Sequence, residues 1–74
     1  MNTEDAKYHN IISDNIRKLR LANKYSQELL AEKLSCSREY VSRIENKKEK
    51  VSLSMLLRVA DLFGISPSKL FIQH

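Results

Sequence analysis

The chain has few of the residues that make tight turns, covalent cross-links or membrane spans. Its single glycine and single proline are too few for the repeated turns of an all-β fold. Its one cysteine, Cys36, excludes an intrachain disulfide and a cysteine cluster for zinc. No apolar run approaches the length of a membrane span, and the N-terminus lacks a signal-peptide pattern. These absences predict a helical protein in the reducing cytoplasm.

Length and charge narrow the class of protein further. With 74 residues the chain is one small domain. Residues 1–10 are polar, and we expect them to form a flexible N-terminal lead-in to a single domain over 11–74. Lysine and arginine number 13 against 9 acidic residues, which gives a formal net charge of +4. A basic surplus indicates a polyanionic partner, although many small basic domains bind no nucleic acid.

Apolar side chains recur with the period of one helix face in the first half of the chain. Ile12, Ile16 and Leu19 predict an amphipathic, basic first helix. It should end near Asn23-Lys24, because asparagine tolerates the left-handed conformation that commonly ends helices. The helices that follow are marked by serines whose hydroxyls can cap a first turn, namely Ser26, Ser37 and Ser52.

The second half of the chain carries the clearest helical pattern. The apolar residues expected on the core face of the helix after Ser52 are Leu53, Leu56, Leu57, Ala60 and Phe63. Gly64 falls where a left-handed C-terminal cap is wanted. Ser66-Pro67 is a second start signal, and it predicts a last short helix that carries Leu70 and Phe71. The fold class is therefore all-α, with five helices.

The second and third predicted helices are joined by only Ser35-Cys36-Ser37. A pair joined so tightly crosses steeply, as in a helix-turn-helix unit. We expect Leu30 and Leu34 of the second helix to pack against Val41 and Ile44 of the third. The small side chain of Ala31 lies where the two helix axes would come closest. The third helix, about 38–46, then has only two core residues, and its remaining side chains are polar.

On these stretches the sequence resembles the helix-turn-helix proteins related to phage Cro and repressors, the XRE family. The matching stretches are 16-IRKLR-20, 26-SQ-27, Ala31, 37-SREYVSRIE-45, 56-LLRVADLFGISP-67 and 70-LF-71. The resemblance implies a compact five-helix fold like that of lambda repressor. A shorter match on the third helix is similar to the controller proteins of restriction–modification systems; it consists of Arg38, Tyr40, Val41 and Ser42.

This chain departs from the family pattern at several positions. The family has glycines where this chain has Lys24, Ser35 and Lys47, and often a glutamate in place of Leu29. Ser35 matters most, because the turn there needs a left-handed residue. A non-glycine in that conformation costs about 1 kcal/mol, and we expect a tolerated penalty rather than a different fold.

The resemblance implies that the third helix enters the major groove of DNA and reads base edges from its N-terminal half. Arg38 is the strongest candidate, because its planar fork can bond guanine O6 and N7 together. Glu39 can accept from a cytosine amine, and Ser42 and Arg43 project one turn further on. The alternative is that all four side chains form an ordinary solvated helix face.

Other polar residues of the matching region are candidates for phosphate contacts. The full set is Gln27, Ser37, Tyr40, Asn46, Lys47, Lys48 and Lys50. Gln27 is at a family position that contacts a phosphate and also touches the recognition helix. Two roles stay open for Tyr40: contact with DNA, and packing of its ring over the second helix. Glu49 interrupts the basic run and works against a close approach of the DNA backbone there.

Several residues have structural interpretations. Arg20 and Glu45 match family positions where a buried ion pair ties the first helix to the third, and we expect this pair to orient the recognition helix. Cys36 occupies an apolar family position, which favours packing over redox sensing. His9 and His74 are too far apart in sequence to indicate a metal site without other ligands.

No nucleophile–base pair, phosphate-binding glycine loop or second domain for a small-molecule effector is visible, so neither catalysis nor a cofactor is expected. We expect a transcriptional regulator that binds double-stranded DNA as a homodimer on an inverted repeat. The expected interface residues are Ile65, Leu70, Phe71 and Ile72. The alternative is that Leu70 and Phe71 close the monomer's own core. Two alternatives stay open: an antitoxin or anti-repressor with secondary DNA binding, and a non-specific nucleic-acid coat.

Overall fold

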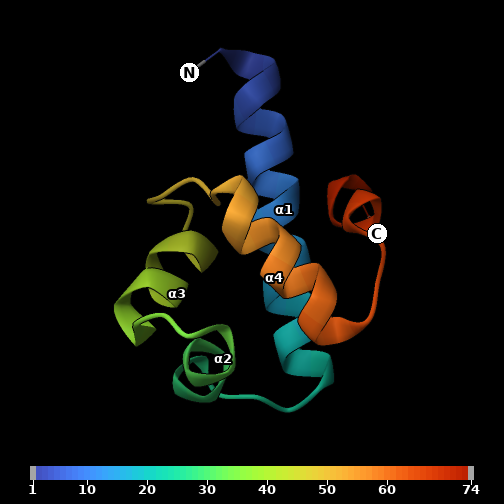
Figure 1. The fold of residues 1–74 in the computed structure, drawn as a ribbon. Helices are drawn as coiled ribbons and strands as arrows, with labels where there is room; N and C mark the ends of the chain where they lie inside the picture. Colours follow the sequence, from blue (N-terminus) through green and yellow to red (C-terminus); the bar gives the residue numbers. More distant parts are fainter. Residues whose placement is uncertain (1, 74) are drawn as a thin grey trace.

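A computed structural model describes residues 2–73 as an assembly of short helices (Figure 1). The helices are α1 (Thr3–Ala22), α2 (Gln27–Leu34), α3 (Arg38–Glu45), α4 (Leu53–Phe63) and the 3₁₀ helix η1 (Pro67–Phe71). No strand occurs within residues 2–73, which confirms the all-α class. The sequence predicted five helices, and residues 2–73 hold four α-helices and one 3₁₀ helix. The last helix is a five-residue 3₁₀ helix, and Ser66 makes no side-chain hydrogen bond that would cap an α-helical turn.

The first helix begins earlier than the sequence suggested. Residues 3–10, expected in a flexible lead-in, are part of α1. The Asn2 side chain caps this helix by accepting a hydrogen bond of 2.8 Å from the Asp5 amide. Glu4 and Asp5 add negative charge to the first turn, where the helix dipole favours it. These polar residues mark the start of α1, and they precede Ile12, where the apolar pattern begins. The apolar pattern alone therefore places the start of the helix too late.

Within residues 2–73, four residues adopt the left-handed conformation, and three of them are not glycine. Lys24, Ser35 and Lys47 have φ of 59°, 57° and 61°, and Gly64 has φ of 66°. These three residues stand at the positions where the family has glycine. The chain therefore keeps the left-handed backbone conformation there, although a side chain makes that conformation less favourable. Asn23 itself is not left-handed, with φ of −94°, because Lys24 takes that role.

The three predicted serine caps are confirmed. The hydroxyls of Ser26, Ser37 and Ser52 accept hydrogen bonds of 3.0, 3.1 and 3.1 Å from amides three residues further on. Each cap satisfies an amide that would otherwise lack a partner in the first helical turn. The start of each of the three helices is therefore fixed by a local contact.

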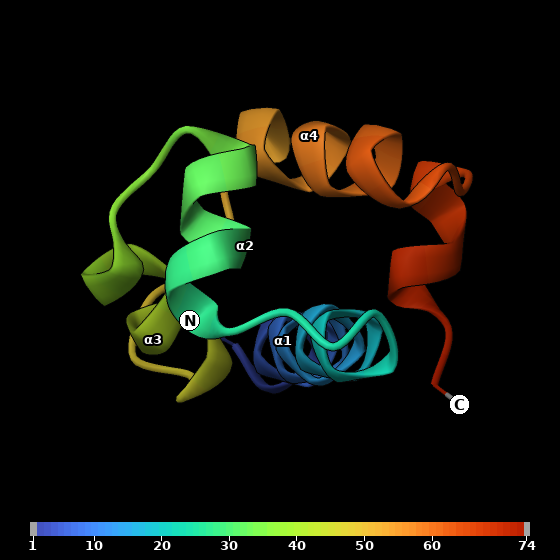
Figure 2. The same cartoon turned by 90° about the horizontal axis from the view of Figure 1, so that it is seen from below.

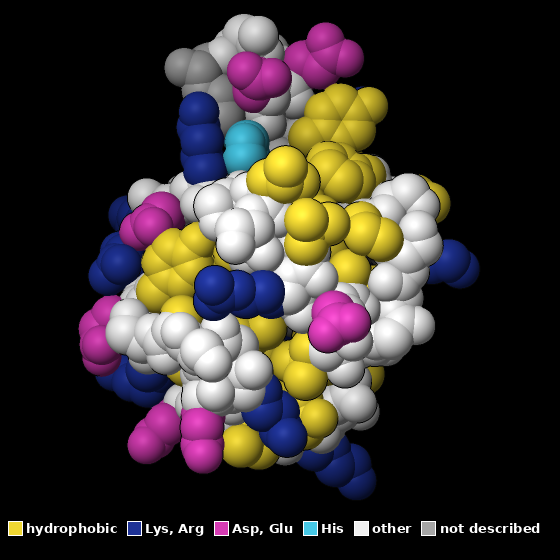
Figure 3. Space-filling view, viewed as in Figure 1, with side chains coloured by type: hydrophobic (Ala, Val, Ile, Leu, Met, Phe, Trp, Pro, Cys, Tyr) yellow, Lys and Arg dark blue, Asp and Glu magenta, His cyan; other side chains and the backbone are white. Residues whose placement is uncertain are grey.

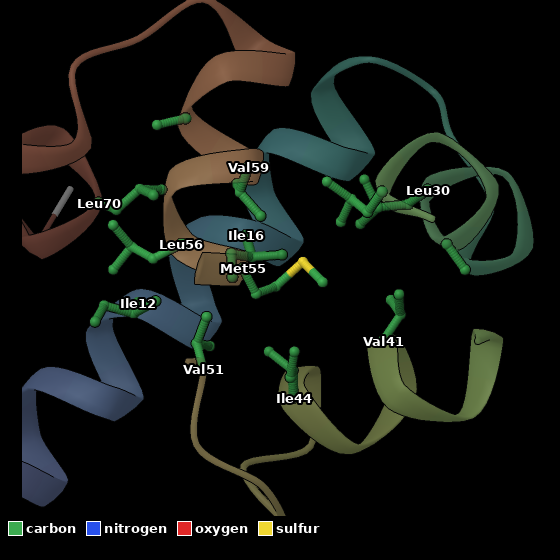
Figure 4. Close-up of a cluster of buried hydrophobic side chains, with 13 residues drawn as sticks. Ile12, Ile16, Leu30, Val41, Ile44, Val51, Met55, Leu56, Val59 and Leu70 are labelled. Carbon is green, nitrogen blue, oxygen red and sulfur yellow. The ribbon is translucent and has the colours of Figure 1, made fainter. Parts of the chain in front are cut away.

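The core is shared by all five helical segments. Figure 4 shows Ile16 of α1, Leu30 of α2 and Met55 and Val59 of α4 pointing toward one another, with side chains of α3 below them. The predicted core face of α4 is partly wrong. Leu53 and Leu57 are 70% and 47% exposed, whereas Met55, Leu56, Val59 and Ala60 are buried. The helix is rotated so that two of its leucines face outward.

Seen from below, α1 and α4 form two layers (Figure 2). The α2–α3 pair closes one end of these layers, and η1 closes the other. Helix α3 lies at the outer edge of its end, and the first turns of α1 extend beyond the other helices (Figure 1). One face of α3 is therefore left uncovered by the rest of the described chain.

Candidate nucleic-acid interface

Three residues form the turn between α2 and α3, and each has a different structural role. Ser35 is left-handed and ends α2. The Cys36 amide donates a hydrogen bond of 2.9 Å back to the Ala31 carbonyl. Ser37 then caps α3. Cys36 is half-buried against the core, as predicted for packing, and burial raises the pKa of its thiol despite a smaller opposing effect of Arg58.

A buried ion pair connects α1 to the end of α3. Arg20 Nε and Nη2 donate to the two carboxylate oxygens of Glu45 at 2.7 and 3.0 Å, a bidentate pair. The two side chains are only 11% and 3% exposed. The third guanidinium nitrogen, Nη1, donates to the Tyr25 carbonyl at 2.9 Å. The expected contact of Arg20 with Glu45 is thus present in the structure.

Gln27 joins the same network from the first turn of α2. Its Nε2 donates to Glu45 Oε1 at 3.1 Å, so this glutamine touches α3, as the family resemblance implied. The amide leaves its oxygen able to accept another hydrogen bond. Helices α1, α2 and α3 are therefore tied at one carboxylate, which fixes the orientation of α3 on the domain.

The four candidate base-reading residues share the outer face of α3. Arg38, Glu39 and Arg43 are exposed and Ser42 is half-buried, while Val41, Ile44 and Glu45 face the domain. Arg38 and Glu39 make only a long contact, 4.0 Å between Nη2 and Oε2. The structure brings these four side chains together on one face, as the sequence predicted. Whether they read bases stays a prediction.

Tyr40 lies at the border of this face. It is half-buried and packs against the hydrophobic core cluster. The ring therefore has the packing role that the sequence left open as one alternative. A contact of its hydroxyl with a phosphate remains a prediction.

The loop after α3 carries ion pairs that sequence reasoning missed. Lys47 Nζ lies 2.9 Å from Asp14 Oδ1 of α1. Arg43 Nε donates to Glu49 Oε1 at 2.7 Å. Glu49 stood out in the sequence only as an interruption of the basic run, and nothing in the sequence marked Asp14. Asn46, Lys48 and Lys50 are exposed in the same loop, and their contact with the DNA backbone stays a prediction.

The four residues predicted for a dimer interface have different environments. Leu70 is fully buried in the monomer's core, so it does not belong to an exposed surface. Ile65 is half-buried, and Phe71 and Ile72 are exposed. Asn15, itself buried, holds this end of the chain by donating through Nδ2 to the carbonyls of Leu70 and Ile72 at 2.9 and 2.8 Å.

Exposed apolar side chains from α1, α4 and η1 gather on the face shown in Figure 3. We call this the apolar patch and define it as Tyr8, Leu53, Leu57 and Phe71. The rings of Tyr8 and Phe71 meet edge to face with centroids 6.4 Å apart. Leu53 and Leu57 lie one helical turn apart on α4. Sequence reasoning missed three of these residues, because it placed the leucines in the core and Tyr8 in the lead-in.

No helix within residues 2–73 combines the length and the apolar character that a membrane crossing requires. In the same part of the chain, no three histidine, cysteine or acidic side chains come together in a way that suits a metal ion. His9 Nδ1 is buried without a hydrogen-bond partner in this part of the chain. His74 lies outside the described residues.

Known proteins resemble this chain over most of its length. A helix-turn-helix family model, HTH_3, matches residues 16–70. Control protein C.SmaI of Serratia marcescens is 38% identical over 64 residues, which are 86% of this chain and 76% of that protein. The restriction-modification controller protein C.AhdI from Aeromonas hydrophila has a TM-score of 0.77 at 35% identity, over 85% of this chain and 96% of that one.

A third relative is described as a hypothetical transcription factor, NHTF, from Neisseria. It has a TM-score of 0.84 at 28% identity and covers 90% of this chain and 75% of that chain. The family match spans the α2–α3 unit and the buried Arg20–Glu45 pair. The resemblance to controller proteins, first seen in a short stretch of the sequence, extends over most of the chain. The chain belongs to the XRE-type helix-turn-helix family of DNA-binding transcription regulators, and its homologues include restriction–modification controller proteins.

Proposed function

We propose that this protein is a sequence-specific transcription regulator that binds an inverted-repeat operator as a homodimer, with α3 in the major groove. The observation that carries this proposal is the exposed polar face of α3, held in place by the Arg20–Glu45–Gln27 network. A helix that is anchored on one side and carries hydrogen-bonding groups on the other suits a groove lined with base edges. A fixed orientation is what such recognition requires.

Each side chain on this surface has a separate task. Arg38, near the N-terminal end of α3, is the principal base reader, and Glu39, Ser42 and Arg43 extend the reading surface. Gln27, Ser37, Tyr40, Asn46, Lys47, Lys48 and Lys50 are the candidates for backbone contacts. Phosphate contacts set register and affinity but carry little sequence information. Base contacts from a single α3 cover only a few base pairs.

The apolar patch supplies the second half of the proposal. Its four side chains, together with the neighbouring Ile72, form an exposed apolar surface on a small domain, which marks an interaction site. A second copy with the same patch gives a two-fold dimer, and its α3 helices would lie about 34 Å apart, one turn of DNA. Because two relatives are named as control proteins, we also propose that the regulated genes belong to a restriction–modification system.

The test begins with selection of duplexes from a randomised pool by the wild-type protein. Fluorescence anisotropy at about 0.15 M salt then compares the selected duplex with a scrambled one. We expect the selected duplex to bind about 10³-fold more tightly or better. Failure to enrich any sequence would contradict sequence-specific regulation and move the search to a protein partner, as for an antitoxin.

Two variants separate reading from backbone contact. Arg38→Ala should weaken binding to the selected duplex by about 1–3 kcal/mol and relax the preference at one base pair. Lys48→Ala should weaken binding to all duplexes alike and lower the salt slope by about 1. Equal loss on both duplexes for Arg38→Ala would show that this arginine binds only the backbone.

A further inference from the structure

Two cations at the C-terminal end of α3 are paired with carboxylates, whereas the arginine at its N-terminal end is not closely held. Arg43 donates to Glu49 at 2.7 Å, and Lys47 lies 2.9 Å from Asp14. Arg38 lies 4.0 Å from its nearest carboxylate oxygen, on Glu39. The proposed DNA surface thus has an arginine without a close carboxylate at one end and two paired cations at the other.

The Arg43–Glu49 pair is not an ordinary neighbour contact along one helix. The two residues are six apart and the pair spans the loop after α3, in which Lys47 is left-handed. The bond uses Nε of the guanidinium, and an arginine has four further N–H donors on its terminal nitrogens. Both side chains are partly exposed, at 49% and 39%, so DNA can reach the pair without unfolding the loop.

We infer that Glu49 determines specificity by pairing with Arg43: it keeps the guanidinium oriented for a base and makes it a poor ligand for phosphates of arbitrary sequence. This inference rests on the proposed function. An arginine free to swing binds any phosphate and so strengthens binding to every duplex. An arginine whose Nε is occupied by a carboxylate has a fixed plane and presents only its terminal groups.

The Lys47–Asp14 pair provides the matched control. Lys47 is a candidate phosphate contact, and a lysine at a phosphate carries no sequence information. Releasing Lys47 from Asp14 should therefore strengthen binding to all duplexes alike. Glu49→Gln and Asp14→Asn each replace a carboxylate by an amide of the same shape, and each raises the formal net charge from +4 by one. A difference between them cannot come from overall charge.

The experiment measures anisotropy of the wild type and both variants with the selected duplex and its scrambled counterpart over a salt series. For Glu49→Gln we expect about fivefold tighter binding to the scrambled duplex at 0.15 M salt, the effect of one added phosphate contact. Its salt slope there should steepen by about 0.9. Binding to the selected duplex should change much less, so the specificity ratio falls. For Asp14→Asn the ratio should stay unchanged.

A second variant background shows whether Glu49 acts through Arg43. In Arg43→Gln protein, the added Glu49→Gln change should leave the specificity ratio as it is. The inference is overturned if Glu49→Gln strengthens both duplexes equally, or if it lowers the ratio by the same factor without Arg43. A wild type that shows no preference for its selected duplex overturns the proposed function itself. A wild type with a preference that Glu49→Gln leaves intact overturns this inference alone.

Discussion

The α2–α3 end of the molecule combines local caps with a buried ion pair, whereas η1 at the other end has no side-chain cap and is held by contacts with α1. At the first end, serine caps and a left-handed Ser35 fix the helix boundaries within three or four residues of sequence. At the other end, Asn15 donates to carbonyls 55 and 57 residues away, and the Tyr8 ring meets Phe71. The first end exposes polar groups, and the second exposes apolar ones.

This contrast suits two different functions at the two ends of the molecule. A surface that reads base edges needs rigid backbone and free polar side chains, and local capping supplies the rigidity without covering the surface. A surface that binds a second copy needs apolar area that the monomer does not use itself, and outward leucines on α4 supply it. The two ends should therefore respond to substitution in different ways.

The largest expected effect comes from breaking the buried ion pair that ties α3 to α1. Arg20→Met removes one partner of a buried pair and leaves the Glu45 carboxylate without its bidentate partner. The free energy of unfolding should fall by about 3–5 kcal/mol. Denaturant unfolding followed by circular dichroism measures this change.

Arg17→Met is the matched control, because Arg17 lies on the same helix and is exposed. A surface substitution of this kind should change the free energy of unfolding by no more than about 0.5 kcal/mol. If Arg20→Met unfolds at the same denaturant concentration as Arg17→Met, the buried pair does not hold α3 on the domain.

The next largest effect should appear at the apolar end, and in assembly rather than in folding. Leu53→Glu places a charge in the apolar patch at a side chain that is 70% exposed in the monomer. The dimer dissociation constant should rise about 100-fold, a loss of about 2.7 kcal/mol from burying an unpaired charge at the interface. Analytical ultracentrifugation measures the change.

Leu21→Glu serves as the control, since Leu21 is an exposed leucine of α1 outside the patch. Its dissociation constant should match that of the wild type. Equal weakening by both substitutions, or by neither, would remove the apolar patch from the proposed dimer. The monomer's own unfolding transition should stay in place for both variants, because neither leucine is buried.

The same contrast explains what the sequence could predict. The caps at Ser26, Ser37 and Ser52 were predictable because each is a contact within one turn. The exposed face of α3 was predictable because only two of its residues are apolar. The rotation of α4 was not, because Met55, Leu56 and Val59 form a second apolar stripe beside that of Leu53, Leu56 and Leu57. The Asp14–Lys47 pair was also out of reach, since it joins residues 33 apart through tertiary packing.

The smallest expected effect concerns the left-handed backbone of Ser35 in the turn between α2 and α3. Ser35 has φ of 57°, a conformation in which a side chain costs about 1 kcal/mol and glycine costs little. Ser35→Gly should therefore raise the free energy of unfolding by up to about 1 kcal/mol, less the entropy that glycine adds to the unfolded chain.

Glu32→Gly in the interior of α2 is the control, and it should lower the free energy of unfolding by about 1 kcal/mol. Opposite signs for the two glycines, with unchanged binding to the selected duplex, would show that the turn is strained and that the strain has no part in recognition. Loss of stability in both variants would instead mean that the Ser35 side chain stabilises the turn.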